Sequence, residues 1–224
     1  MSPAEAGTSG HDSGLVLVGA RHGTNEFPHL TPVPAAAAAR WGHVIVALEL
    51  GDDARDPISA FSRSAGTVAD QDRLLAAPSW QQHDGRASQA TFRLADGLRA
   101  QIAAGAVIEL DVFDATPFGD PRSASQIERE RMLAERLLST RRRGATLALT
   151  GNVHAELVPR SDAAAGFVPA AALIAEDVNL VSLPGANSSR STRPRLIGLA
   201  APTSGRSHHH AQPSSIRLPD GWRA

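Results

Sequence analysis

The sequence predicts an α/β fold with a mostly parallel β-sheet that is flanked by helices. Short runs of aliphatic residues alternate along the chain with longer stretches of helical periodicity, which is the pattern of strand–helix–strand units. The aliphatic runs lack polar alternation, as expected of strands that are buried on both faces. With 224 residues, 42% of them hydrophobic, the chain is long enough for one domain with a sizeable core.

The individual elements follow from hydrophobic periodicity and from signals at their ends. Residues 87–104 carry apolar side chains at helical spacing and stop at Gly105, a residue that favours a helix end. Residues 125–143 begin with Ser125 and Glu128 at capping-box spacing and end in three arginines, which suit the negative end of a helix. We expect strands at 15–19, 44–50, 107–113, 146–149, 178–183 and 196–200, helices at 35–41, 58–77 (in two pieces broken near Gly66), 87–104, 125–143 and 170–175, and a polar loop at 78–86.

The two ends of the chain are expected to lie outside the folded domain. Residues 1–13 are small and polar, and they predict a disordered N-terminal tail without the basic and apolar regions of a signal peptide. Residues 14–201 are expected to form the α/β domain. Residues 202–224, with three consecutive histidines at 208–210, are expected to form a flexible C-terminal tail. No window approaches the ~20 apolar residues of a membrane span, so we expect a cytoplasmic location.

Three residue types are absent, and each absence removes a class of chemistry. The chain has no lysine, which excludes a Schiff-base mechanism. It has no cysteine, which excludes disulfides, thiolate metal sites and a thiol nucleophile. It has no tyrosine, so no phenol can act as an acid or a haem ligand. The net charge of −1 gives no electrostatic reason to expect nucleic acid as a partner.

Two Gly-x-x-His motifs mark the expected functional site. The first runs from Gly19 to His22 and the second from Gly151 to His154, each directly after an aliphatic run. Parallel strands present their carboxyl ends at one edge of the sheet, where ligands bind, so both histidines are expected there. A histidine at that edge can serve as a base or as a metal ligand. The alternative for each is a loop histidine bonded to a nearby carbonyl.

Carboxylates are expected at the same edge. Glu49 lies near the end of an aliphatic run, where burial would require a partner for its charge; the alternative is a carboxylate that just reaches solvent. Asp114 follows the third expected strand and is a second candidate. Within that strand Glu109 and Asp111 alternate with apolar residues, so we expect these two on a solvated face.

Arginines supply the expected positive charge. Arg86 follows an Asp-Gly turn, and Arg129 lies on the long helix, where it would pair with a buried carboxylate or hold an oxyanion. The chain has no Gly-x-Ser-x-Gly elbow, His-Glu-x-x-His helix, P-loop or Gly-x-Gly-x-x-Gly motif. We therefore do not expect a serine hydrolase, a zincin, a kinase or a dinucleotide enzyme.

The motifs, in this order, resemble those of a known superfamily. The segments concerned are GARHGTNEFP (19–28), LEL (48–50), DGR (84–86), RERMLAERL (129–137) and GNVHA (151–155). They are similar to segments of the superfamily of erythromycin esterases, ChaN haem-binding proteins and Tiki/TraB proteins (the EreA/ChaN-like superfamily), over residues 15–183. The resemblance implies an α/β core with its site at the strand ends.

The resemblance also implies roles for individual residues. His22 resembles the histidine that activates water in the esterases, or a metal-binding histidine in Tiki-type proteases. Glu49 resembles the second-strand glutamate, Arg129 the helix arginine, and His154 the histidine of the second Gly-x-x-His motif. Residues expected to bind substrate are Arg21, Glu26, Arg86, Asp114 and Asn152.

The chain departs from the superfamily at one position and in one residue type. Many esterase-like and ChaN-like members have a glutamate directly after the first glycine, where this chain has Ala20 followed by Arg21. The missing carboxylate would weaken base activation or metal binding. ChaN resembles a tyrosine-ligated haem protein, and without tyrosine this chain would have to hold haem through its histidines.

These observations are compatible with three functions. The first is a hydrolase for an ester, lactone or amide of a small molecule or peptide, in which His22 takes a proton from a water that Glu49 orients. Arg129 and His154 would then stabilise the oxyanion. The second is a metal-dependent hydrolase in which His22, Glu49 and His154 hold Zn²⁺ or Mn²⁺. The third is a non-catalytic protein that binds haem or another ligand.

Overall fold

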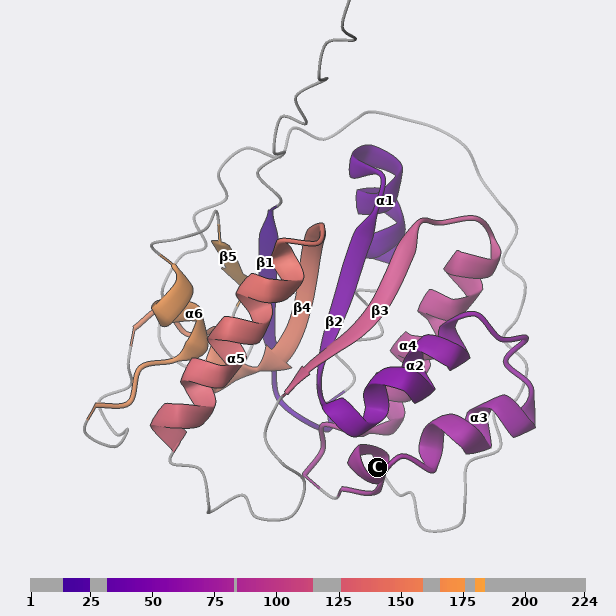
Figure 1. Cartoon of the computed structure of the whole chain (residues 1–224), viewed down its shortest axis with the longest axis horizontal. Coiled ribbons are helices and arrows are strands. Elements are labelled where there is room, and N and C mark those ends of the chain that lie inside the picture. The colour runs from indigo at the N-terminus through magenta and orange to yellow at the C-terminus, as the bar shows by residue number, and fades with distance from the viewer. Residues whose placement is uncertain are drawn as a thin grey trace, which may run out of the picture.

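The computed structural model of the chain contains a parallel sheet with the strand order β3–β2–β4–β1–β5 (Figure 1). The strands are β1 (Leu15–Ala20), β2 (Val44–Gly51), β3 (Ile108–Asp114), β4 (Ala145–Gly151) and β5 (Leu180–Leu183). Every neighbouring pair in this order is parallel. The structure describes residues 14–24, 32–82, 84–114, 126–158, 166–175 and 180–183. The predicted α/β fold is confirmed, whereas the expected strand at 196–200 and both tails lie outside the described residues.

Helices connect the strands and cover the two faces of the sheet. They are α1 (Pro32–Trp41), α2 (Arg55–Ser62), α3 (Val68–Leu75), α4 (Gln89–Ala103), α5 (Gln126–Arg141) and α6 (Ala170–Ile174), with short 3₁₀ helices η2 (Asp52–Ala54), η3 (Pro78–Gln81) and η4 (Asn152–Ala155). The predicted break near Gly66 is confirmed. Gly66 has a positive φ of 72°, and Thr67 begins α3 with a capping box to Asp70.

Side chains of β2 alternate between two hydrophobic cores, and this alternation determines which helices each side chain contacts. Val46 and Leu48 belong to a core that includes residues of α1, α2, α3 and α4. Ala47 belongs to a second core with Leu133 of α5 and residues of α6. Glu49 shares the parity of Ala47, so its side chain extends toward α5, the helix that crosses in front of the sheet in Figure 1.

The segment 78–86, predicted to be a polar loop, contributes instead to the core. Its first half is the 3₁₀ helix η3, in which Trp80 is completely buried. The indole packs edge-on against Phe92 of α4, with ring centroids 6.3 Å apart. The prediction is wrong for this half because one large aromatic side chain outweighs the polar residues around it.

The edge strand β3 is covered by ion pairs. Arg143 donates to Glu109 and to Asp111, each at 2.6 Å, and Asp111 also pairs with Arg55 of α2. Asp111 is only 4% exposed. The prediction of a solvated face is therefore wrong for Asp111, because two arginines neutralise it and allow its burial.

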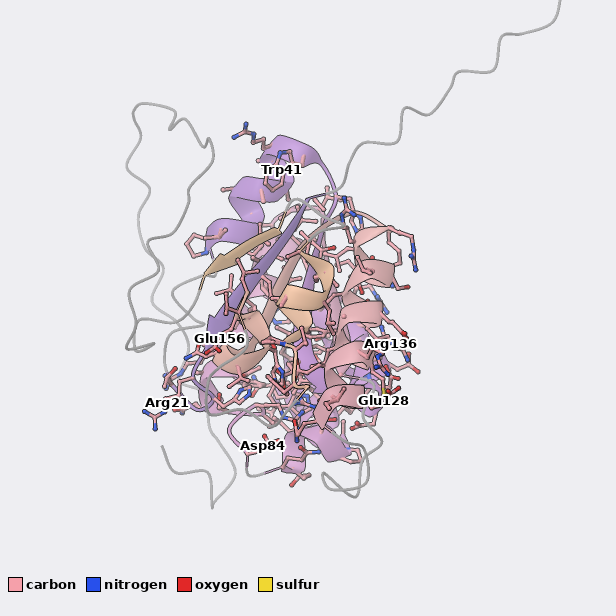
Figure 2. All side chains as sticks on the ribbon, turned by 90° about the vertical axis from the view of Figure 1, so that its left-hand side faces the viewer. Arg21, Trp41, Asp84, Glu128, Arg136 and Glu156 are labelled. Carbon is pink, nitrogen blue, oxygen red and sulfur yellow. The ribbon has the colours of Figure 1, made fainter. Side chains whose placement is uncertain are left out.

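The carboxyl ends of β1, β2, β3 and β4 meet at one edge of the sheet. Figure 2 shows Arg21, which directly follows β1, at the same end of the molecule as Asp84 and Glu156, with Trp41 at the opposite end. Among the described residues, no helix combines the length and the apolarity that a membrane span requires.

Candidate functional site

Glu49 is the centre of the polar cluster at the carboxyl edge. Its Oε1 accepts a hydrogen bond from Arg129 Nη2 at 2.6 Å, and its Oε2 accepts from Thr150 Oγ1 at 2.5 Å and from the Gly151 amide at 2.7 Å. Glu49 is 5% exposed, so it is a buried, paired carboxylate and not one that reaches solvent. Burial alone would raise its pKa, but the positive charges of His154 and Arg129 outweigh this and lower the pKa to about 2.

Asp114 joins two arginines to the cluster. It ends β3 in a buried position, accepts from Arg129 Nη2 at 3.0 Å and pairs with Arg86. Arg86 Nε donates to Asp84 at 2.6 Å, and Arg86 Nη2 donates to Gln82 at 2.9 Å. Arg86 is thus fixed in place, and the guanidinium of Arg129 bridges two carboxylates from different strands.

The two Gly-x-x-His motifs pack against each other, and this explains both glycines. A Cβ at Gly19 would lie 2.7 Å from the Cβ of Ala155 and 3.1 Å from the Cα of Asn152. A Cβ at Gly151 would lie 2.7 Å from His22 Nε2. The glycine of each motif therefore leaves room for residues of the other, at distances so short that a Cβ would force a neighbouring group to move.

His22 stands at the end of β1 and faces Glu49. Its Nε2 lies 3.9 Å from Glu49 Oε2, and its Nδ1 is buried without a hydrogen-bond partner among the described residues. Burial lowers the pKa of His22 below 6.5; the negative charge of Glu49 opposes this and the positive charge of Arg86 assists it. His22 is therefore a neutral imidazole at neutral pH.

His154, the second motif histidine, is held more tightly. It lies in η4 and is almost fully buried. Its Nδ1 is 2.6 Å from Glu130 Oε1, and its Nε2 is 2.9 Å from Arg129 Nη1 and 3.5 Å from Glu49 Oε1. Burial lowers the pKa of His154, but Glu49 and Glu130 outweigh this effect and raise it above 6.5.

Glu130 belongs to this cluster and was not predicted. It is completely buried, and its Oε2 accepts from the amide of Ala170, the first residue of α6, at 2.8 Å. The sequence does contain a signal for it. Glu130 precedes Leu133, Ala134 and Leu137 by three, four and seven residues, which places it on the buried stripe of α5.

A small cleft opens beside the cluster. It encloses about 10 Å³, room for about one water molecule, and its polar lining includes His22, Glu49 and Arg86. Leu48, Leu50, Thr91, Leu149 and Thr150 complete the lining. Arg129 and His154 do not line this cleft, so the cluster has a layer that faces the cleft and a layer behind Glu49.

The structure brings together most of the residues that the sequence predicted. His22, Glu49, Arg86, Asp114, Arg129 and His154 all belong to the cluster. Asn152 packs on the end of β1 beside Gly19, and Arg21 is exposed next to His22. Glu26 lies outside the described residues.

The predicted metal ligands do not fit a divalent cation. His22, Glu49 and His154 approach one another, but the guanidinium of Arg129 contacts both Glu49 and His154 and would repel a second cation there. Within the described ranges, no three His, Asp or Glu side chains are grouped as metal ligands. The cleft itself is too small for haem, because it has room for about one water molecule.

Comparison with known proteins identifies distant structural neighbours. No protein-family model matches this chain, and no curated protein matches its sequence. The type III effector HopBA1 matches with a TM-score of 0.44 and 16% identity, over 62% of this chain and 67% of that chain. RRSP, a MARTX toxin effector domain from Vibrio vulnificus CMCP6, matches with a TM-score of 0.44 and 15% identity, over 65% of this chain and 28% of that chain. At this level of similarity neither structure bears on the activity of the present chain.

Proposed function

We propose that this chain is a hydrolase for an ester, lactone or amide of a small molecule or peptide, with His22 as the general base. The observation that carries the proposal is the placement of a neutral imidazole beside an ionised carboxylate in the wall of one cleft. The 3.9 Å between His22 Nε2 and Glu49 Oε2 exceeds a hydrogen bond and suits two groups that share a water. A base within reach of a positioned water is the first requirement for general base catalysis.

The reaction then proceeds in two steps. His22 Nε2 takes a proton from the water as its oxygen bonds to the carbonyl carbon. Arg86, a cation in the cleft wall, stabilises the negative charge that develops on the carbonyl oxygen. The tetrahedral intermediate then collapses, the C–O or C–N bond breaks, and His22 passes its proton to the leaving group. One water is consumed, and the enzyme returns to its starting state.

Glu49 orients the water in this scheme and does not itself take the proton. Its low pKa keeps it ionised, and both of its oxygens accept hydrogen bonds. Its charge also stabilises the imidazolium that forms on His22. Since Arg86 lines the cleft and Arg129 lies behind Glu49, we assign the oxyanion to Arg86 and the holding of Glu49 to Arg129.

The sequence resemblance supports the same reaction class. The two Gly-x-x-His motifs and the second-strand glutamate resemble those of the erythromycin esterases, whose histidine activates water. The position after Gly19 is Ala20 here, so this scheme uses Glu49 as the carboxylate partner of His22.

A substrate screen with two matched histidine variants tests the proposal. Aryl esters, lactones and amides would be assayed with the wild type, His22→Ala and His43→Ala. His43 is an exposed histidine paired with Glu109 at the opposite end of the sheet, so His43→Ala should retain full activity. Loss of the base should lower turnover by about 10²–10⁴-fold.

Two results would contradict the proposal. Equal turnover in the wild type and in folded His22→Ala would show that His22 is not the base. Absence of turnover by the wild type across the screen would favour the non-catalytic ligand-binding alternative. A chelator added to the active wild type should leave its rate unchanged, and a loss restored by Zn²⁺ or Mn²⁺ would reinstate the metal hypothesis.

A further inference from the structure

A buried chain of hydrogen bonds runs behind the proposed catalytic groups. It starts at Glu130 in α5, passes through both nitrogens of His154 and reaches the guanidinium of Arg129, which binds Glu49. The distances along the chain are 2.6, 2.9 and 2.6 Å. The chain thus connects a fully buried carboxylate to the carboxylate that faces the cleft.

The donors and acceptors fix one tautomer of the neutral His154 ring. Arginine has no acceptor, so Arg129 Nη1 must donate to His154 Nε2, which therefore carries no hydrogen. The hydrogen of the neutral ring then lies on Nδ1, where Glu130 Oε1 accepts it. A carboxylate is suited to this position because it accepts only, whereas an amide would also present a donor.

We propose that Glu130 is a positioning residue of the hydrolase site, which sets the tautomer of His154 and through it the orientation of Arg129. Arg129 uses Nη2 to bind Glu49 and Asp114, and the acceptor at His154 Nε2 holds its other terminal nitrogen. With both ends held, the guanidinium keeps Glu49 in the position that orients water toward His22. The proposal rests on the proposed function for its effect on turnover but not for the tautomer itself.

The simpler reading is that Glu130 only attaches α6 to the sheet. Glu130 Oε2 accepts from the Ala170 amide, and losing that bond would leave a buried donor unsatisfied. The two roles use different oxygens of one carboxylate. They can therefore be separated by removing one donor at a time.

Several charged groups face His154, and they bear on its protonation. Glu130 and Arg129 approach it from α5 and Glu49 approaches it from β2, while His22 acts on it from the end of β1. When the ring gains a second proton, Nε2 can no longer accept from Arg129. The tautomer is therefore defined at alkaline pH, where the ring is neutral.

The first test is the ¹⁵N NMR spectrum of the histidine rings in the wild-type full chain at alkaline pH, with His154→Ala used for assignment. We expect His154 Nδ1 to show the shift of a protonated ring nitrogen and Nε2 that of an unprotonated one. The opposite pattern would overturn the proposal, whether or not any substrate has been found.

The second test compares Glu130→Gln with Ala170→Pro. In Glu130→Gln, the amide satisfies both of its neighbours only if its oxygen accepts from the Ala170 amide and its NH₂ donates to His154 Nδ1. The ring should then switch to the Nε2–H tautomer, and Arg129 Nη1 loses its acceptor and is displaced. Ala170→Pro removes only the backbone donor, at a first helical position where proline is tolerated. Because Ala170 is itself buried, thermal unfolding should first establish that this variant is folded.

The positioning role and the structural role give different outcomes. If Glu130 positions His154, only Glu130→Gln switches the tautomer. Its kcat, measured at the alkaline pH at which the ring is neutral, then falls about 10–100-fold, the loss seen when partners that orient functional histidines are removed; KM should change little. If both variants keep the wild-type tautomer, the role of Glu130 is structural and the proposal is wrong. Should Glu130→Gln not fold, the wild-type spectrum still tests the proposal, because an Nε2–H tautomer would overturn it. Failure of the hydrolase proposal would appear separately, as absence of turnover with the expected tautomer intact.

Discussion

Two networks of arginines and carboxylates lie on this sheet, and they differ in burial and in charge balance. The edge network covers β3 and consists of Asp52, Glu109, Asp111, Arg55, Arg136 and Arg143. The site cluster lies at the carboxyl edge and consists of Glu49, Asp114, Glu130, Arg86, Arg129 and the two motif histidines. The edge network has three guanidiniums and three carboxylates, whereas the site cluster has two guanidiniums and three buried carboxylates.

The difference indicates what each network does. The arginines of the edge network are 33–46% exposed, so solvent screens its ion pairs, and its effect is to cover an edge strand that would otherwise be open to pairing. The carboxylates of the site cluster are buried with one negative charge in excess. A proton on His154 would remove that excess, which agrees with its raised pKa. The excess negative charge therefore lies in the cluster that contains the two Gly-x-x-His motifs.

The largest expected effect comes from neutralising one carboxylate in each network. Glu49→Gln leaves the partly buried Arg129 without its closest partner, and breaking a buried pair destabilises a protein by up to about 3–5 kcal/mol. Glu109→Gln breaks a half-exposed pair with Arg143, which contributes about 0–1 kcal/mol. Denaturant unfolding of the two variants and the wild type measures both effects.

The same variants show whether the site cluster is specifically required for turnover. Glu109→Gln should keep wild-type activity, whereas Glu49→Gln should lose it even at temperatures at which the variant remains folded. Equal destabilisation by the two substitutions would mean that the two networks do not differ in the way described.

Acid should act on the site cluster through Glu49. Its folded pKa of about 2 lies below the ordinary value of 4.5, so the group stabilises the fold fully above pH 4.5, and this contribution is lost as pH falls from 4.5 toward 2. The shift corresponds to about 3 kcal/mol. Unfolding free energies measured across this pH range should fall more steeply for the wild type than for Glu49→Gln. Parallel curves would show that Glu49 is not the carboxylate responsible.

The fold could be predicted because its signals are local. Uninterrupted aliphatic runs at residues 15–18 and 44–48 identify buried parallel strands, and Gly105 marks the end of α4. Trp80 could not be placed by such signals, because nothing in its polar neighbourhood indicates that the chain bends to bury it. Tertiary packing determines the conformation of that segment, as it often does around isolated large side chains.

The candidate site was predictable to the extent that its residues lie at strand ends. His22, Glu49, Asp114 and His154 converge because parallel strands end at one edge. The pairing of Arg129 with a buried carboxylate was one of the expected alternatives. The roles of Glu130 and Asp111 depend on which side chains face them across the fold, and neighbours in sequence do not specify this. Only the helical stripe that contains Glu130 gave a partial signal.

A smaller effect is expected from glycines at the two ends of β4. A Cβ at Gly151 would lie 2.7 Å from His22 Nε2, and a Cβ at Gly144 would lie 3.0 Å from His43 Nδ1. Neither backbone has the positive φ that strains alanine. Gly151→Ala should therefore displace the ring of His22 and lower turnover at least about 10-fold, with a stability loss of roughly 1–3 kcal/mol from overpacking.

Gly144→Ala provides the matched control, because it moves a histidine outside the site cluster. It should leave turnover unchanged, as measured with the substrate found in the screen. If both alanine variants were fully active, the position of the His22 ring against Gly151 would not matter for the reaction.

The smallest expected effects are opposite pH dependences of the two motif histidines. His22 has a folded pKa below 6.5, so the unfolded chain binds more protons at that group, and stability falls as pH drops below 6.5. His154 has a folded pKa above 6.5, so its contribution is fully present below pH 6.5 and is lost as pH rises through the folded pKa. NMR titration of the ring protons, with His22→Ala and His154→Ala for assignment, should give the two histidines titration midpoints on opposite sides of pH 6.5.

Turnover should accordingly decline in acid only below pH 6.5, as His22 becomes protonated. If His22 titrated above His154, the base of the reaction would have to be sought in the second motif.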